Sequence, residues 1–270
     1  ASVESTAILP TIGSKEFVAW LPTLLGLGPN DHIVIPKVAY PTYAVGAALC
    51  GARVTATDEP ELIDDAALIW LNTPGNPTGH VLSAERMRTI VNHARKIGAI
   101  VASDECYYEL GWTQEPVSIL NPAVCDGDHE GLLAVHSLSK RSNFAGYRFG
   151  FTAGDPTIIK QLLEVRKHGG LMVPAPVQHA AAVAYADDEH VAIQRERYRA
   201  RRDLLDDLLH AVPRRPHLRH PRPPQRRPRR VERGHVRQRQ RGPELRPQGA
   251  HRPRRAVRPG RRVPRGDRRP

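Results

Sequence analysis

The chain has 270 residues, of which 40% are apolar, enough for one large or two ordinary domains with a packed core. Its formal net charge of +12 is not spread evenly. Residues 213–270 hold 22 arginines and three acids, whereas residues 1–212 hold 18 basic and 25 acidic side chains. The first 212 residues are therefore mildly acidic. No apolar run approaches the roughly 20 residues of a membrane span, so we expect no membrane-spanning helix.

The three cysteines, Cys50, Cys106 and Cys125, are widely spaced and form no Cys-x-x-Cys pair. This pattern argues against a disulfide framework and against a zinc site, so we predict free thiols, no bound metal and a cytoplasmic location. The chain begins with Ala1–Glu4, which lacks the basic and then apolar pattern of a secretory signal. We interpret the N-terminus as incomplete.

Short apolar runs alternate with helical stretches over the first 212 residues, which is typical of βαβ units and a mostly parallel sheet. The runs are nearly continuous in their apolar character, as expected for strands that are covered on both faces. The predicted fold class is therefore α/β. We predict strands at His32–Pro36, Arg53–Thr57, Ala67–Asn72, Ala99–Asp104, Leu132–Ser137 and Phe149–Ala153.

Helices are predicted between these strands. One opens at the turn Gly13-Ser14 and carries apolar residues at helical spacing. Ser83 is placed to cap a second helix, which stops at Gly98, and a third fills Asp155–Gly170. A long amphipathic helix is predicted over Asp187–Val212, and its length suggests that it leads to a second domain.

The composition changes abruptly at Pro213. Arginine and proline make up 34 of the last 58 residues, and no aromatic residue or lysine occurs among them. Such a segment cannot bury enough apolar surface to fold. It is either a basic tail for nucleic acid or G/C-rich DNA read out of frame, and the absent lysines and aromatics favour the second interpretation. We thus divide the chain into a large domain (1–186), a connecting helix (187–212) and a disordered, out-of-frame tail (213–270).

Lys140 is the first candidate for chemistry. It lies just past the end of a predicted strand, where ligands gather in open α/β sheets, although most lysines at such places are solvated surface charges. Ser137 and Ser139 precede it, and Arg148 follows in a glycine-containing loop. A lysine that binds a phosphorylated carbonyl cofactor needs a nearby cation and hydroxyls for the phosphate. These four side chains supply that set.

Asp104 ends a predicted strand and is followed closely by Tyr107. A carboxylate there can cap a helix or bind a metal, but it can also keep a pyridine nitrogen protonated. Tyr107 is suited to hydrogen-bond a ring oxygen, or it is a half-buried aromatic with a solvated hydroxyl. Asn76, in the turn Asn-Pro-Thr-Gly, is suited to the same ring oxygen, although turn chemistry alone explains the proline and glycine.

Two further segments complete the candidate site. Gly13, Ser14 and Lys15 form a turn at the start of a helix, where free amides bind phosphate. Tyr40, which precedes Pro41, is placed to stack on a flat ring or to pack in the core.

In their order along the chain, these segments resemble those of the class I/II (fold type I) aminotransferases, which depend on pyridoxal 5′-phosphate (PLP). The resemblance covers about Leu9 to Val212. It is closest to the actinobacterial N-succinyldiaminopimelate aminotransferases of lysine biosynthesis. The segments that suggest this subgroup are Tyr40-Pro-Thr-Tyr, Ser103-Asp-Glu-Cys-Tyr, Asp126-Gly-Asp-His and His136-Ser-Leu-Ser-Lys.

The resemblance implies a role for each candidate residue. It implies that Lys140 binds PLP covalently and shuttles the substrate proton, that Asp104 holds the ring nitrogen, and that Tyr40 stacks on the ring. Asn76 and Tyr107 would bind the ring hydroxyl. The phosphate would be bound by Gly13, Ser14, Lys15, Ser137, Ser139 and Arg148.

Two parts of the family pattern have no counterpart in the sequence. Intact members carry a further N-terminal stretch, and they end in a small domain whose arginine grips the substrate carboxylate. We assign that arginine to no residue. Apolar residues of Asp187–Val212 that should face the small domain would then be exposed, so we expect a poorly soluble or short-lived product.

The resemblance implies transfer of an amino group from glutamate to an oxo-acid, N-succinyl-2-amino-6-oxopimelate, by a homodimer of the intact protein. A C–S lyase or a cyclopropane-forming synthase has the same cofactor site and is the alternative enzyme. An inactive fragment and a nucleic-acid-binding protein that acts through the basic tail are the remaining alternatives.

Overall fold

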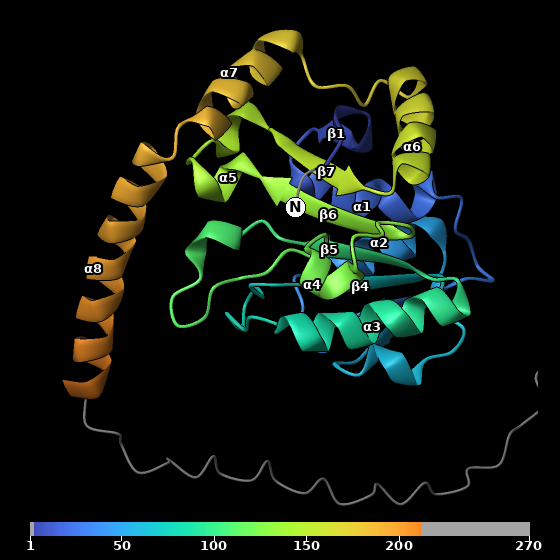
Figure 1. Ribbon diagram of the computed structural model, residues 1–270, viewed down its shortest axis with the longest axis horizontal. Coiled ribbons are helices and arrows are strands. Elements are labelled where there is room, and N and C mark those ends of the chain that lie inside the picture. The colour runs from blue at the N-terminus through green and yellow to red at the C-terminus, as the bar shows by residue number, and fades with distance from the viewer. Residues whose placement is uncertain (1–2, 212–270) are drawn as a thin grey trace, which may run out of the picture. The chain divides into compact units, whose positions relative to one another are not determined.

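The computed structural model describes residues 3–211 (Figure 1). The predicted out-of-frame tail, 213–270, lies outside the described residues. Within residues 3–211, none of the helices combines the length and the apolar character that crossing a membrane requires.

Seven strands form one sheet in the order β1-β7-β6-β5-β4-β2-β3. Strands β3, β2, β4, β5 and β6 are parallel neighbours, whereas β7 and β1 are antiparallel to theirs. The mostly parallel α/β fold is thus confirmed, and every predicted strand is present. The bounds are β1 Ile8–Thr11, β2 His32–Ile35, β3 Arg53–Ala56, β4 Leu68–Asn72, β5 Ile100–Asp104, β6 Leu132–Ser137 and β7 Gly150–Gly154.

Two strands differ from the prediction. Strand β1 was not predicted: it has four residues, one of them Pro10, and it is ordered by pairing with β7, where Thr11 lies opposite Gly150. Strand β3 is present, but the expectation that it is covered on both faces is wrong. It lies at the edge of the sheet, and three of its four residues are exposed.

Helices connect the strands as expected, and their caps follow the sequence. The Ser83 hydroxyl accepts from the Arg86 amide at the start of α3, and Asp155 accepts from two amides at the start of α6. Helices α2, α4, α5 and α7 were not predicted. The bounds are α1 Ser14–Leu24, α2 Thr42–Cys50, α3 Ala84–Ile97, α4 Pro122–Cys125, α5 Leu138–Arg141, α6 Pro156–His168, α7 Ala175–Ala186 and α8 Glu189–Ala211, with short 3-10 turns η1 Ser5–Ala7, η2 Pro60–Leu62, η3 Tyr108–Leu110 and η4 Ala145–Tyr147.

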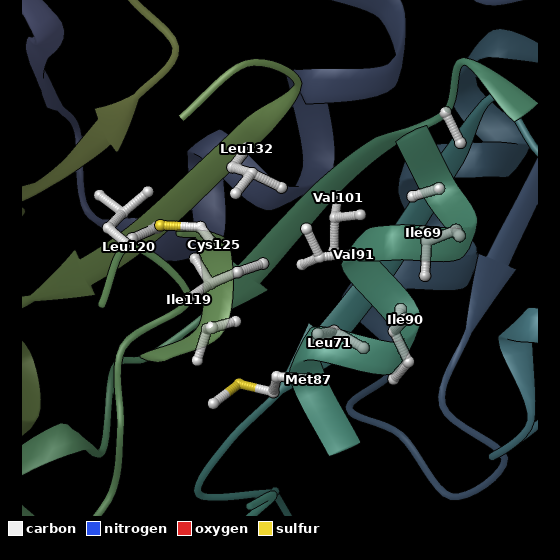
Figure 2. Close-up of a cluster of buried hydrophobic side chains, with 14 of the residues drawn as sticks. Ile69, Leu71, Met87, Ile90, Val91, Val101, Ile119, Leu120, Cys125 and Leu132 are labelled. Atoms are coloured by element: carbon white, nitrogen blue, oxygen red, sulfur yellow. The ribbon is translucent and has the colours of Figure 1, made fainter. Parts of the chain in front are cut away.

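Apolar layers cover both faces of the sheet. On one face, α3 and α4 pack on the central strands (Figure 2), through residues that include Ile69, Leu71, Met87, Ile90, Val91, Val101, Ile119, Leu120, Cys125 and Leu132. On the other face, α1, α2 and α6 bury Phe17, Leu21, Ile33, Tyr43, Trp70, Val135 and Leu162, among others. Trp20, which the helical spacing placed on the apolar face of α1, is instead 41% exposed.

Helix α8 follows α7 along one side of the sheet (Figure 1). It contacts the body near its start, where His190 meets the Ser142 hydroxyl at 2.9 Å. Further along, its leucines are exposed, at fractions from 53% to 62% for Leu204, Leu205, Leu208 and Leu209. That this helix leads to a second domain stays a prediction, and so does poor solubility.

One buried ion pair fixes the start of α1. Arg166 of α6 is fully buried, and its guanidinium donates two bonds to the Glu16 carboxylate, at 2.9 and 3.0 Å. A third bond from Arg166 reaches the carbonyl of Leu171. The Glu16 carboxylate also accepts from the Ile12 amide at 3.2 Å. The pair therefore joins α6 to the turn that precedes Ser14.

We predict that Glu16→Gln lowers the free energy of unfolding by about 3–5 kcal/mol, because it leaves a buried guanidinium without its counter-charge. Urea unfolding followed by circular dichroism measures this. Combining Glu16→Gln with Arg166→Met should restore part of the loss. Glu164→Gln, which breaks an exposed pair with Lys167, is the control and should change stability little. Equal effects of Glu16→Gln and Glu164→Gln would contradict the prediction.

Candidate active site

The parallel strands β4, β5 and β6 end at one edge of the sheet, where Asn72 of β4 lies opposite Asp104 of β5. A cavity of about 230 Å³ opens beyond these strand ends. Ten of the eleven residues predicted from the sequence line it. They are Ser14, Lys15, Tyr40, Asn76, Asp104, Tyr107, Ser137, Ser139, Lys140 and Arg148.

Gly13 is the eleventh predicted residue, and it lies behind the cavity wall. Its φ is +73°, and a Cβ atom there would lie 2.2 Å from a terminal nitrogen of Arg148. Gly13 therefore makes room for the guanidinium. A direct contact between Gly13 and a ligand stays a prediction.

The cationic side of the cavity is built where the antiparallel strands meet α1. Ser14 begins α1, so its first amides and Lys15 reach the cavity, and free helix-start amides attract anions. Arg148 has left-handed backbone geometry, with φ 56°, and its guanidinium donates to the carbonyl of Ala145 at 2.9 Å. A Cβ on Gly150 would lie 2.6 Å from the His136 carbonyl oxygen and 3.0 Å from the Ser14 amide nitrogen, so the chain needs glycine there.

Lys140 comes from α5, a single helical turn that directly follows β6. Its amine lies 5.6 Å from the centre of the Tyr107 ring. The turn starts at a capped position, because the Ser137 hydroxyl accepts from the Ser139 amide at 3.2 Å. Ser137 is buried and Lys140 is exposed, so the amine is free to react with a bound ligand.

Asn76 and Tyr107 lie together, as the sequence predicted for two residues that address one ring oxygen. The Asn76 amide donates to the Tyr107 hydroxyl at 3.5 Å. The Asn72 side chain links the two segments that carry them. Its Oδ1 accepts from the Asn76 backbone amide at 2.7 Å, and its Nδ2 donates to the Asp104 backbone carbonyl at 3.0 Å. Burial raises the pKa of Tyr107, so its hydroxyl stays protonated and can donate.

Asp104 is buried at the end of β5, and Tyr43 of α2 is its main partner. The Tyr43 hydroxyl donates to one carboxylate oxygen at 2.9 Å, and the Cys106 amide donates to the other at 3.2 Å. Burial raises the pKa of Asp104, while these two hydrogen bonds oppose the rise. Burial also raises the pKa of Tyr43, with the Asp104 charge adding to it, so Tyr43 stays a donor. A cation next to Asp104 would favour the ionised carboxylate.

Sequence reasoning missed Tyr43 and Asn72. Tyr43 is the last residue of the quoted segment Tyr40-Pro-Thr-Tyr, but its role depends on α2, which was not predicted. Its ring is buried against Trp70, with 5.2 Å between the ring centres. A helix predicted from Thr42 would have placed the Tyr43 side chain on the face that packs against the sheet. No local signal pointed to Asn72, because its two partners become neighbours only in the folded sheet.

Glu105, which is buried, and His136, which is partly buried, form a pair next to Asp104 in the sequence and sheet. One oxygen of Glu105 accepts from the Ile119 amide at 2.8 Å, and the other lies 3.4 Å from His136 Nε2. Burial raises the pKa of Glu105 to about 7 and lowers the pKa of His136 to about 4. Burial at this strand end thus disfavours the charge of both carboxylates. Among residues 3–211 there is no cluster of three or more His, Cys, Asp or Glu side chains able to bind a metal.

The family model for aminotransferases of class I and II matches residues 1–223 of this chain. The chain belongs to that family.

Individual relatives agree with this assignment. The chain is 58% identical over 201 residues to the probable aminotransferase Rv1178 of Mycobacterium tuberculosis, covering 74% of the chain and 48% of that protein. It is 53% identical over 210 residues to 4-dedimethylamino-4-oxo-anhydrotetracycline transaminase OxyQ of Streptomyces rimosus, covering 77% and 58%. It is similar in structure to N-succinyldiaminopimelate aminotransferase from Mycobacterium tuberculosis, with a TM-score of 0.71 and 25% identity over 78% of this chain and 58% of that one. The aminotransferase chain thus spans about half the length of the curated relatives it matches.

The Glu105–His136 pair predicts a pH dependence of stability. The pKa of Glu105 in the folded state, about 7, exceeds its ordinary value of 4.5, so the folded state holds that proton more tightly. Glu105 therefore costs stability as the pH rises from about 4.5 to 7. Burial lowers the His136 pKa from 6.5 to about 4, so His136 costs stability as the pH falls from about 6.5 to 4. This contribution is the same in the wild type and in a variant at Glu105.

We predict that Glu105→Gln gains stability relative to the wild type by up to about 3 kcal/mol between pH 5 and pH 8. Urea unfolding at several pH values measures the difference. Glu130→Gln, an exposed control, should follow the wild-type curve. A difference between Glu105→Gln and wild type that does not change with pH would mean that Glu105 is ionised throughout.

Proposed function

We propose that the chain is the cofactor-binding part of a PLP-dependent aminotransferase that moves an amino group from glutamate to an oxo-acid. One observation carries the proposal. An amine (Lys140), a buried carboxylate (Asp104) and a guanidinium (Arg148), far apart in the sequence, line a single cavity.

The donor set of the cavity fits a phosphorylated pyridine. The start of α1, Lys15 and Arg148 provide cationic and amide donors for the phosphate, and the Ser137 and Ser139 hydroxyls lie in the same wall. The close packing of Gly13 on Arg148 supports this role for the guanidinium, because any side chain at residue 13 would displace it.

The remaining residues fit the ring. Asp104 would hold the protonated ring nitrogen, and Tyr43 would keep the carboxylate aimed at it. Asn76 and Tyr107, already hydrogen-bonded to each other, would share the ring oxygen. Tyr40 would stack on the ring, and the Lys15 amine lies 5.3 Å from the centre of the Tyr40 ring.

When bound, PLP supplies an electron sink for the pair released at the substrate α-carbon. The side chains of this chain would do the rest. Lys140 Nζ would attach the cofactor and then carry the proton away from the α-carbon. Asp104 would keep the ring nitrogen protonated, because burial leaves its carboxylate short of compensating charge despite the two hydrogen bonds from Tyr43 and Cys106.

For the amino acceptor, we propose N-succinyl-2-amino-6-oxopimelate. The four segments shared with the actinobacterial succinyldiaminopimelate aminotransferases support this acceptor, and so does the structural similarity to the Mycobacterium tuberculosis enzyme. A second acceptor class is a ketone on a fused ring system. It is favoured by the 53% identity to OxyQ, which is named for a 4-oxo-anhydrotetracycline.

We further propose that the intact protein is a cytoplasmic homodimer in which residues 1–186 form the large domain and residues 187–212 lead to a small domain. The exposed leucines of α8 support a covering domain, because a helix rarely leaves such a row to water. The three free cysteines agree with a reducing compartment.

Covalent trapping tests the proposal. PLP is added to the purified chain, the product is reduced with borohydride, and the modified residue is found by peptide mass spectrometry. We expect Lys140 to carry the label, Lys140→Ala to lose it together with the visible absorbance band, and the exposed control Lys160→Ala to keep both. A label spread over several lysines, or none, would refute the function.

A second prediction concerns Tyr43. Tyr43→Phe removes the side-chain donor to the buried carboxylate, so we expect the Kd for PLP to rise about tenfold. Absorbance titration measures it. Tyr185→Phe is the matched control, because that buried hydroxyl has no hydrogen-bond partner among the described residues. An unchanged Kd in Tyr43→Phe would show that the Tyr43 hydroxyl does not contribute to binding of PLP.

A further inference from the structure

The turn that carries Lys140 is too short to be stable by itself. Helix α5 has four residues, and the Leu138 carbonyl at its start accepts from the Ser142 amide at 3.0 Å and from the Phe144 amide at 3.1 Å. A single helical turn fixes several backbone angles in return for few hydrogen bonds, so it does not persist without tertiary contacts. Contacts from outside α5 therefore fix the position of the Lys140 amine.

Arg141, the next residue, makes contacts of this kind. Successive residues of a helix point about 100° apart, so Lys140 lines the cofactor cavity while Arg141 does not. The Arg141 side chain is only 5% exposed. Its guanidinium carbon lies 5.1 Å from the centre of the Tyr185 ring of α7. A buried guanidinium is costly unless carboxylates and carbonyls accept its hydrogen bonds, so its partners determine where α5 lies.

The acceptors of Arg141 belong to two other segments. Its Nε donates to the carboxylate of Glu109, which lies in η3 two residues after Tyr107, at 3.1 Å. Its terminal nitrogens donate to the Ala184 carbonyl in the last turn of α7, at 2.7 Å, and to the Asp188 carboxylate just before α8. One guanidinium thus joins α5 to the segment that carries Tyr107 and to the junction of α7 and α8 (Figure 1).

The two residues that follow Arg141 are held by α8 as well. His190 meets the Ser142 hydroxyl at 2.9 Å, and the Tyr198 hydroxyl donates to the side-chain oxygen of Asn143 at 3.1 Å. Asn143 has left-handed backbone geometry, with φ 53°. The chain therefore leaves α5 along a path that α8 fixes, and Arg141 is the buried member of this series of contacts.

We propose that Arg141 is a positioning residue, which holds the Lys140 amine in a fixed relation to Tyr107 and so determines the orientation in which PLP is bound. The inference rests on the proposed function, because it requires PLP at Lys140. The Lys140 amine lies 5.6 Å from the centre of the Tyr107 ring, and the bond between Arg141 and Glu109 links the segments of both residues. Neither Arg141 nor Glu109 lines the cofactor cavity, so Arg141 acts through Lys140.

The visible circular dichroism of bound PLP tests the proposal. A cofactor held in one orientation by a chiral site shows dichroism in its visible absorbance band. With the signal of unbound PLP subtracted, the ratio of dichroism to absorbance does not depend on how much of the protein is folded. A loss of stability alone would therefore leave this ratio unchanged.

Arg141→Met keeps an unbranched side chain but removes the N–H donors. We expect the ratio of dichroism to absorbance to fall, and the Kd for PLP to rise about tenfold, because Lys140 and Tyr107 are no longer preorganised. Arg141→Lys keeps the charge but cannot reach every acceptor, so its ratio should lie between those of Arg141→Met and the wild type.

Arg86→Met is the matched control. Arg86 also donates to a carboxylate, that of Glu61, and to a backbone carbonyl, that of Asp58, but it does not line the cofactor cavity. Its loss should leave both the ratio and the Kd at the wild-type values.

A second variant covers the case in which Arg141→Met does not fold. Glu109→Ala removes a carboxylate that is 34% exposed and leaves the contacts of Arg141 with α7 and Asp188 in place, so it should fold and lower the ratio. Glu115→Ala, which removes an exposed carboxylate paired with Arg195, should not. A wild-type ratio in Glu109→Ala would overturn the inference. Failure of the proposed function looks different, because the wild type would then show no visible absorbance band.

Discussion

The desolvated carboxylate of Asp104 is the constraint on which the site depends. The strand that carries it is buried, so an ionised side chain there costs free energy unless donors or a cation compensate. Tyr43 and the Cys106 amide supply two hydrogen bonds, and the pKa of Asp104 is raised even so. Burial also raises the pKa of the neighbouring Glu105, to about 7. Among residues 3–211, the hydrogen bonds to the Asp104 carboxylate come from a hydroxyl and an amide and none from a cation, and a protonated pyridine nitrogen would supply that charge.

The order of the sheet distributes the other groups around that carboxylate. The start of α1 and Arg148 come from the antiparallel strands β1 and β7, Lys140 follows β6, Asp104 ends β5, and Asn76 follows β4. Cationic and amide donors thus gather on one side of Asp104 and hydroxyl and amide groups on the other. The buried Glu16–Arg166 pair holds the α1 end of this series, through a contact between residues 150 positions apart. The two ends of the cavity therefore differ in their chemistry.

The sequence was sufficient for the parallel strands and for ten residues of the cavity wall, because buried strands read as apolar runs and the site residues follow their ends. The sequence was insufficient wherever long-range contacts determine whether an element forms or which side chains meet. Strand β1 contains Pro10 and forms only by pairing with β7, and α2 has little amphipathic pattern because it is apolar on most sides. Tyr43 reaches Asp104 across 61 residues. Such a partner can be inferred only after α2 has been placed on the sheet.

The loop that carries Trp112 differs from the strand ends in what holds it in place. The residues at the strand ends are fixed by sheet register and by buried pairs, whereas Trp112 is contacted by arginines of α8. The same helix exposes Leu205 and Leu209 beyond Arg202. A domain that covered those leucines would contact the turns of α8 that carry the arginines. Through these arginines it would affect the position of the Trp112 ring. Coverage of α8 and the position of Trp112 are then coupled through one helix, while the residues around Lys140 are held by the sheet.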